Sequence, residues 1–486
     1  MAQWIWACEP VLGWRGVRAI AWRGLAALLM ATGTMAQPAV LPSAPMPPVT
    51  VLRISEDPFV SPVPGQHASE VEPAAAAHGG TVLAAFQVGR LLGGGSVAIG
   101  WARWQAGHWR HGLLPGLTAG QRPPGPYRLV SDPSVAYDAA RGRWLIAILA
   151  IAGQSHQQRT SVLVARSPDG THWGGRAYAL VATAAPGGYD KPWIACDNTA
   201  RSPYYGRCYA TWDRSGRVDR LVMSTSRDGG ATWGAPATPT GGPAGLGGEP
   251  VVQRSGVVIV PTLGELRRGV AIIAVTSHDG GVTWGPATLV SRVRHHPAAG
   301  GLRAGPLPSV AIDGADRVYV AWPDCRFEPG CGANDIVLSS STDGLRWAPV
   351  ARVPITARGS GADYVLAGLG ASPTGGSAQA QLVLTYYAYP RARCTRATCR
   401  LGVGAIASAD GGATWDGARR LTDGMSLAWL ATSGGAMVGD YLATVVVPGA
   451  AWGIFAAARA PHVGRLDEAM YGAFLPVPAV RSAKTG

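Results

Sequence analysis

The stretch Ser226-Arg-Asp-Gly-Gly-Ala-Thr-Trp233 recurs along this chain and decides the fold. Matching octapeptides occupy residues 277–284 and 408–415, and copies one residue shorter occupy 167–173 and 341–347. The copies lie roughly 50 to 70 residues apart, a period suited to a repeated unit of four strands. Each carboxylate is placed to accept hydrogen bonds from the amides of its own turn, and the glycines supply positive φ. We therefore predict a structural role for the motif aspartates Asp169, Asp228, Asp279, Asp343 and Asp410.

A second repeat precedes each turn, in which an acidic residue, usually followed by proline, opens a short apolar strand. The predicted inner strands begin at Glu72, Asp132, Asp190, Glu249, Leu307, Asp363 and Asp440. Each is followed by a turn and a second apolar strand. This pattern predicts an all-β fold, a β-propeller with seven blades in preference to six. A strand at 49–54 would complete the seventh blade and close the ring, which removes the exposed edges of an open sheet.

The chain divides into four predicted segments. Arginines, an apolar stretch at 24–33 and a small-x-small site at 34–36 predict a signal peptide over residues 1–36. A linker at 37–48, the propeller at 49–478 and a disordered tail at 479–486 follow. No later segment approaches the roughly 20 apolar residues of a transmembrane helix. We therefore expect a secreted or periplasmic protein with no transmembrane segment after cleavage of the signal.

The number and spacing of the cysteines are those expected of an exported protein. Beyond Cys8 there are six, and they form close pairs in the sequence. Such pairs in an oxidising compartment predict disulfides. A zinc site is the alternative, but the spacings lack clustered histidines. The predicted pairs are Cys196 with Cys208, Cys325 with Cys331, and Cys394 with Cys399.

Composition and charge narrow the function classes. The chain has 67 glycines, 38 prolines and 18 tryptophans, with 47% hydrophobic and 15% charged residues, which excludes a disordered chain. The net charge of +13 comes almost wholly from arginine and favours anionic ligands such as carboxylated glycans. The arginines are dispersed, so nucleic acid is not expected as a partner. Serine-hydrolase, phosphate-loop and zinc-protease motifs are absent from the sequence.

The five turn motifs resemble the Asp-box repeats of bacterial sialidases and cover about residues 160 to 420. Two further segments, Tyr189-Asp-Lys-Pro-Trp193 with its flanks and Ala321-Trp-Pro-Asp-Cys-Arg326, resemble secreted sialidase-like propellers described as exo-α-sialidases. Sialidases hold the substrate carboxylate with three arginines and use a tyrosine nucleophile, an assisting glutamate and an acid–base aspartate. The chain departs from their Arg-Ile-Pro motif, because Arg53-Ile54 is followed by serine.

Blade topology predicts where a site lies. Residues before the first strand and after the second strand of each blade converge on one mouth. The acids that open the inner strands would line the axis, with arginines around them, an arrangement suited to glycoside hydrolysis. With the resemblance, this predicts Asp132 as acid and base, Tyr441 as nucleophile and Glu249 as its partner. The predicted substrate-binding residues are Arg90, Arg214, Arg326, Asp190 and Lys191.

Two alternatives stay open. An acid before proline often fixes a turn, so these residues can be purely structural, in a propeller that binds glycans or proteins without catalysis. A ring of carboxylates can also hold calcium, although no cofactor is otherwise expected. The sequence gives no oligomeric state and no particular sugar.

Overall fold

The computed structural model describes residues 49–61, 63–153, 158–174, 178–184 and 188–477. The predicted signal peptide at 1–36, linker at 37–48 and tail at 479–486 lie outside these residues. Within the described ranges, no helix is long and apolar enough to span a bilayer. The 3-10 turns described are η2 (Ala299–Gly301), η3 (Pro329–Cys331), η4 (Ser377–Gln379) and η5 (Leu427–Trp429).

Strands pair with their sequence neighbours as antiparallel hairpins, so the predicted all-β fold class is confirmed. The strands fall into consecutive units in chain order, because each tight turn returns the chain beside the strand it has just left. The units are β2 (Gln66–His78), β3 (Thr81–Arg90), β4 (Ser96–Gln105) and β5 (His108–Leu113); β6 (Leu129–Asp138), β7 (Arg143–Ala152), β8 (Arg159–Ser167) and β9 (Ala179–Thr183); β10 (Tyr189–Cys196), β11 (Cys208–Arg214) and β12 (Arg220–Ser226); β13 (Val251–Val252), β14 (Val258–Glu265), β15 (Val270–Ser277) and β16 (Thr288–Arg292); β17 (Ser309–Ile312), β18 (Val318–Asp324), β19 (Asp335–Ser341) and β20 (Ala351–Arg352); β21 (Asp363–Ala371), β22 (Leu382–Tyr389), β23 (Arg400–Ser408) and β24 (Arg419–Arg420); and β28 (Ala443–Val447), β29 (Ala450–Ala458) and β30 (Glu468–Pro476). Three short strands supplement them: β25 (Met425–Ser426), β26 (Ala431–Thr432) and β27 (Ala436–Met437).

The first strands of these units contact one another in sequence. Each of these strands contacts the next one in the order β2, β6, β10, β13, β17, β21 and β28, and β28 contacts β2. These are the strands that the acid-proline repeat predicted. Between them, buried apolar side chains of adjacent units pack into shared clusters, such as Leu145 and Val164 with Ile194 and Trp212.

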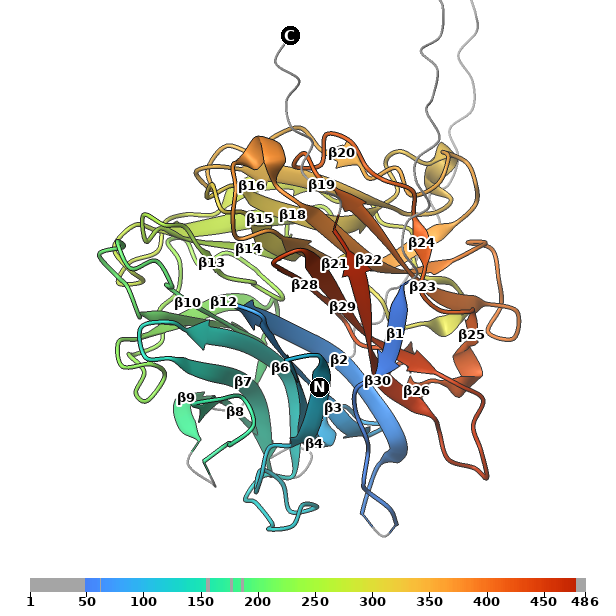
Figure 1. The fold of residues 1–486 in the computed structure, drawn as a ribbon, viewed down its shortest axis with the longest axis horizontal. Coiled ribbons are helices and arrows are strands. Elements are labelled where there is room, and N and C mark those ends of the chain that lie inside the picture. The colour runs from blue at the N-terminus through green and yellow to red at the C-terminus, as the bar shows by residue number, and fades with distance from the viewer. Residues whose placement is uncertain (1–48, 62, 154–157, 175–177, 185–187, 478–486) are drawn as a thin grey trace, which may run out of the picture. The chain divides into compact units, whose positions relative to one another are not determined.

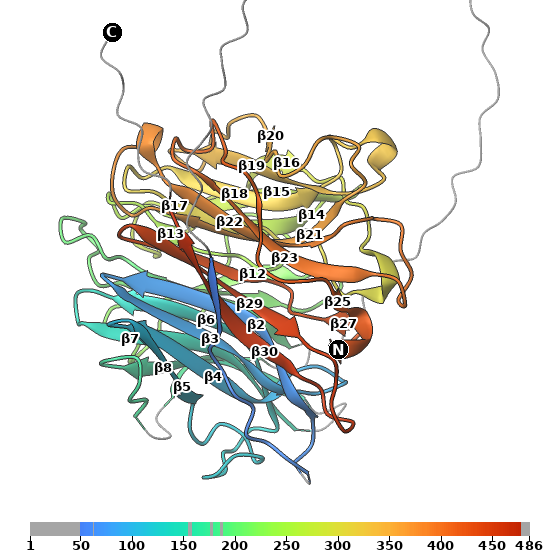
Figure 2. The ribbon, with the colours of Figure 1, turned by 45° about the vertical axis from the view of Figure 1, so that its right-hand side comes forward.

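The N-terminal strand joins the C-terminal unit. β1 (Thr50–Arg53) pairs antiparallel with β30, from Thr50 opposite Phe474 to Arg53 opposite Tyr471. Figures 1 and 2 show the blue N-terminal strands beside the red C-terminal strands. The pairing predicted for residues 49–54 is therefore present, and it covers an edge of β30 that would otherwise offer unpaired amides.

The Asp-box turns share one set of hydrogen bonds. In the second copy, Asp228 Oδ1 accepts from Ser226 Oγ at 2.9 Å and from the amides of Ala231 and Thr232 at 3.0 and 2.9 Å. Burial opposes ionisation of Asp228, but these hydrogen bonds outweigh it and lower its pKa to about 2. Serine and amide contacts of the same kind hold Asp169, Asp279, Asp343 and Asp410.

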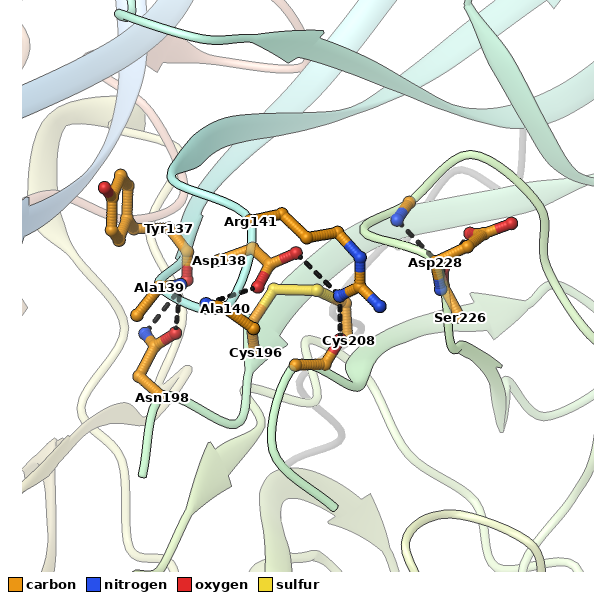
Figure 3. Close-up of a disulfide and its surroundings, with 12 residues drawn as sticks. Tyr137, Asp138, Ala139, Ala140, Arg141, Cys196, Asn198, Cys208, Ser226 and Asp228 are labelled. Atoms are coloured by element: carbon orange, nitrogen blue, oxygen red, sulfur yellow. Dashed lines mark hydrogen bonds and ion pairs between the residues drawn. A yellow bond between two sulfur atoms is a disulfide. The ribbon is translucent and has the colours of Figure 1, made fainter. Parts of the chain in front are cut away.

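The three cysteine pairs expected from the sequence are all disulfides in the structure. Cys196 and Cys208 are register partners that join the end of β10 to the start of β11 (Figure 3). Beyond them the loop contacts the preceding unit. Asn198 accepts from the Ala139 amide at 2.8 Å, and Arg141 donates to Gly206 O at 2.8 Å. The disulfide thus braces a loop that joins two units.

Replacing Asp228 by alanine is expected to lower stability by about 1 to 2 kcal/mol, because the turn amides lose their acceptor. Thermal unfolding of the mature protein measures the loss. The control Asp228→Asn keeps one acceptor oxygen and is expected to lose less. A catalytic role for Asp228 would instead abolish turnover without a change in melting temperature.

Candidate functional site

Three consecutive inner strands each carry a charged residue in a strained backbone conformation directly before proline. Glu72, Asp132 and Lys191 have φ values of 56°, 46° and 44°. Each lies at a shift in strand register, which marks a β-bulge. A positive φ is unfavourable for residues other than glycine and concentrates at functional sites. In β2, β6 and β10 the acid-proline repeat is therefore a bulge, and Lys191 rather than Asp190 occupies the equivalent position in β10.

Side chains from these bulges meet residues of the C-terminal segment. Lys191 Nζ lies 2.5 Å from Asp440 Oδ2 and 3.5 Å from Asp132 Oδ1. Arg303 Nη2 lies 2.5 Å from the same Asp440 oxygen. Lys191 is 5% exposed, whereas the Arg303 side chain keeps 35% of its surface exposed. The charged cluster is defined as Glu72, Asp132, Asp190, Lys191, Arg303 and Asp440.

Glu72 is the most deeply buried acid of the cluster, at 1% exposure. One of its oxygens accepts from the Asp440 amide at 3.1 Å, and the other accepts from Gln87 Nε2. Arg90 donates to Gln87 Oε1 and, at 3.2 Å, to Ser433 Oγ. Arg90, predicted to bind substrate, therefore meets the cluster through Gln87 and is itself buried.

The environment separates the protonation states of the carboxyl groups. Burial, reinforced by Asp132, raises the pKa of Glu72 to about 8. Burial and Asp132 likewise raise the pKa of Asp190 to about 6, against the opposing charge of Lys191. Burial also opposes ionisation of Asp440, but Lys191 and Arg303 outweigh it and hold that pKa well below its usual range. At neutral pH a protonated carboxyl thus lies beside an ionised one, which is the arrangement that acid–base catalysis requires.

Lys191 remains charged despite its burial. Burial lowers its pKa, but the carboxylates of Asp440 and Asp132 outweigh this and raise the pKa well above its ordinary value. Its positive charge and that of Arg303 balance the acids. Among the described residues, no group of three or more His, Cys, Asp or Glu side chains is arranged to hold a metal ion.

Tyr441 and Glu249 are the predicted nucleophile and its partner. The Tyr441 hydroxyl, on a residue 8% exposed, donates to Pro133 O at 3.2 Å, and burial together with Glu72 raises its pKa well above 10. Glu249 instead accepts from the Val310 amide at 2.9 Å, and burial raises its pKa to about 8. The structure thus gives Glu249 and Tyr441 separate hydrogen-bond partners, and the activation of Tyr441 by Glu249 stays a prediction.

In the described part of the chain, neither Arg214 nor Arg326 forms an ion pair with a residue of the charged cluster. Arg214 is exposed at the end of β11. Arg326 is held by Asp324, two residues away, through contacts of 2.9 and 2.7 Å, and by Ser291 Oγ at 3.0 Å. The partners of Arg326 thus lie in β18 and β16, and a shared substrate site for Arg90, Arg214 and Arg326 stays a prediction.

Arg303 was not predicted. It lies in the loop between β16 and β17, just after η2, where its amide donates to Ala436 O at 2.8 Å. That contact holds the loop against the segment leading to Asp440. Arg303 belongs to neither repeat, so the sequence carried no signal for it.

Comparison with known proteins gives fold-level similarity at most. No protein-family model and no curated protein sequence matches the chain. Among solved structures, the NanB sialidase from Streptococcus pneumoniae is 14% identical, with 86% of this chain and 70% of that chain covered and a TM-score of 0.42. The α-L-arabinofuranosidase Arb93A from Fusarium graminearum is 14% identical, with 70% of this chain and 93% of that chain covered and a TM-score of 0.41. A PL25 ulvan lyase is 13% identical, with 87% of this chain and 95% of that chain covered and a TM-score of 0.49. At these scores and identities the similarities do not assign an activity to this chain.

Asp440→Asn is expected to destabilise the protein by roughly 3 kcal/mol, because Lys191 and Arg303 then lose their shared buried counter-charge. Adding Lys191→Met should recover part of the loss, since it removes one unpaired cation. Denaturant unfolding of the single and double variants measures this coupling. Strictly additive losses would show that the two side chains do not interact.

Proposed function

We propose that this protein is an exported, carbohydrate-active propeller that hydrolyses glycosidic bonds next to acidic sugars. The observation that carries the proposal is the charged cluster, in which carboxyl groups with opposite protonation preferences lie beside exposed guanidinium surface. Hydrolysis of a glycoside needs a proton donor for the leaving oxygen and a second carboxylate for water or the sugar. The three disulfides support export, because such bonds persist in oxidising compartments.

We infer seven blades. The order of contacts among the inner strands, from β2 round to β28 and back to β2, supports seven units over six. β1 would then be the outer strand of the last blade. In this arrangement the inner strands bring distant segments to one axis, which explains how Lys191 and Asp440 meet.

In the proposed reaction, Asp190 donates its proton to the glycosidic oxygen as the bond to the sugar breaks. Its pKa of about 6 and its partial exposure suit this role. The Asp132 carboxylate accepts the proton of the attacking water. The Arg303 guanidinium donates to Asp440, Ser433 and Met437, keeps 35% of its side-chain surface exposed, and would bind the acidic group of the substrate on that exposed side.

A non-catalytic glycan-binding propeller is the second candidate. It is favoured by the near-complete burial of Lys191 and by its contacts with Asp132 and Asp440, which satisfy the cluster without any ligand. In that case the cluster stabilises the ring and the binding surface lies around it.

Release of fluorophore from 4-methylumbelliferyl sialoside, glucuronide and neutral glycosides by the mature protein distinguishes the two. We expect turnover of an acidic glycoside that falls as the pH rises above about 6, since the proton donor must be protonated. Asp190→Asn should lower turnover by about 10²- to 10⁴-fold, whereas Asp228→Asn should leave it unchanged.

Tyr441→Phe separates this mechanism from that of a tyrosine nucleophile. Turnover within about tenfold of the parent is expected, because the hydroxyl is committed to Pro133. Complete loss of turnover in this variant would indicate that Tyr441 is the nucleophile. Silence across the whole panel from a correctly folded protein would favour the binding propeller.

A further inference from the structure

A concentration of arginines lies in the loop that joins β22 to β23. We define the arginine loop as residues 390–400, which carry Arg391, Arg393, Arg396 and Arg400, all exposed. The Cys394–Cys399 disulfide closes the loop. The buried Ala392 donates its amide to Gly361 O at 2.7 Å and so anchors the loop to a neighbouring one that exposes Arg358.

The described residues supply no ion-pair partner for the charge of this loop. In the described part of the chain, none of its four arginines forms an ion pair. Arg400 Nη1 donates to carbonyl oxygens of Ala397 and Cys399 at 2.9 and 2.8 Å, which fixes the loop and leaves its charge in place. The carboxylate of Glu328 accepts a hydrogen bond from the Gly359 amide, in the loop that exposes Arg358, at 2.9 Å.

The arginine loop follows the second strand of its unit. It therefore lies at the edge where the first strand of that unit begins, and the residues of the charged cluster lie at the corresponding edge of their own units. Tyr389 at the end of β22 pairs with Asp363 at the start of β21, just as Asp213, one residue before the end of β11, pairs with Asp190, the second residue of β10. Loops that follow the second strands therefore share the edge on which the inner strands begin.

The loop also packs on the segment that delivers Arg303 to the cluster. Gly300 in η2 lies so close that a Cβ there would be 2.7 Å from Cys399 Sγ and 3.3 Å from Arg396 Cα. Tyr389 donates its hydroxyl to Ala299 O at 3.2 Å. Only Gly301 and Leu302 lie between Gly300 and Arg303, so the arginine loop packs directly beside the segment that carries Arg303.

We propose that the arginine loop is a subsite for an anionic polysaccharide whose chain continues from the charged cluster. Forked guanidinium groups match the planar carboxylate of a uronate and the oxygens of a sulfate ester. The disulfide holds the loop in shape before binding, so little ordering is required when the polymer binds. This inference rests on the proposed function, because it extends the same site from one acidic sugar to a polyanionic chain.

Affinity electrophoresis of the mature protein through gels containing polygalacturonate, dextran sulfate or neutral dextran tests the subsite. Retardation by one or both polyanions is expected, with none by dextran. The variant R391Q/R393Q/R396Q should bind about tenfold more weakly, as expected for the loss of three surface ion pairs. The matched control R110Q/R201Q/R346Q removes the same charge from exposed arginines elsewhere and should bind as the parent does.

The outcomes separate this inference from the proposed function. Equal weakening in both triple variants would overturn the subsite, because net charge alone would then explain binding. Retention by anionic phospholipid vesicles but by neither polysaccharide would also overturn it. Turnover of small acidic glycosides without polymer binding would contradict the subsite and leave the hydrolase standing. Arginine-dependent polymer binding without turnover would support the subsite and contradict hydrolysis.

Discussion

The buried ammonium group of Lys191 is the interaction on which the centre of this molecule depends. Several carboxyl groups converge from separate strands, and an uncompensated cluster of such charges would be too costly to bury. Lys191 and Arg303 supply the opposite charge, with Asp440 shared between them. Burial and Asp132 raise the pKa values of Glu72 and Asp190 although Lys191 opposes the rise, whereas Lys191 and Arg303 keep Asp440 ionised.

The strained bulges explain how the cluster is delivered. A regular strand alternates its side chains between two faces, whereas a bulge re-aims one of them. Glu72, Asp132 and Lys191 are re-aimed in this way, each at a local shift in strand register. Rigid units around them, braced by the Asp-box turns and the Cys196–Cys208 disulfide, hold the strain. Such conformations persist only where the surrounding structure enforces them.

Much of the fold followed from local sequence patterns, and the site did not. The turn at Asp228 and the pairing of Cys196 with Cys208 depend on residues close in the chain, so the sequence alone predicted them. The acid-proline repeat located the inner strands, but it did not distinguish Lys191 from the acids at equivalent positions. Nor could it reveal that Glu249 bonds to a neighbouring strand. Arg303 reaches the cluster from an irregular loop, and only the three-dimensional packing of that loop brings it there.

The most direct measurement of the cluster is the titration of Glu72. Carbon-13 NMR of protein labelled at the glutamate carboxyl carbon, with Glu72→Gln to assign the signal, follows its protonation as the pH changes. Because burial and Asp132 disfavour its ionised form, the Glu72 signal should move at about pH 8. A signal that titrates near the ordinary value of 4.5 would contradict a cluster in which a protonated carboxyl lies beside an ionised one at neutral pH.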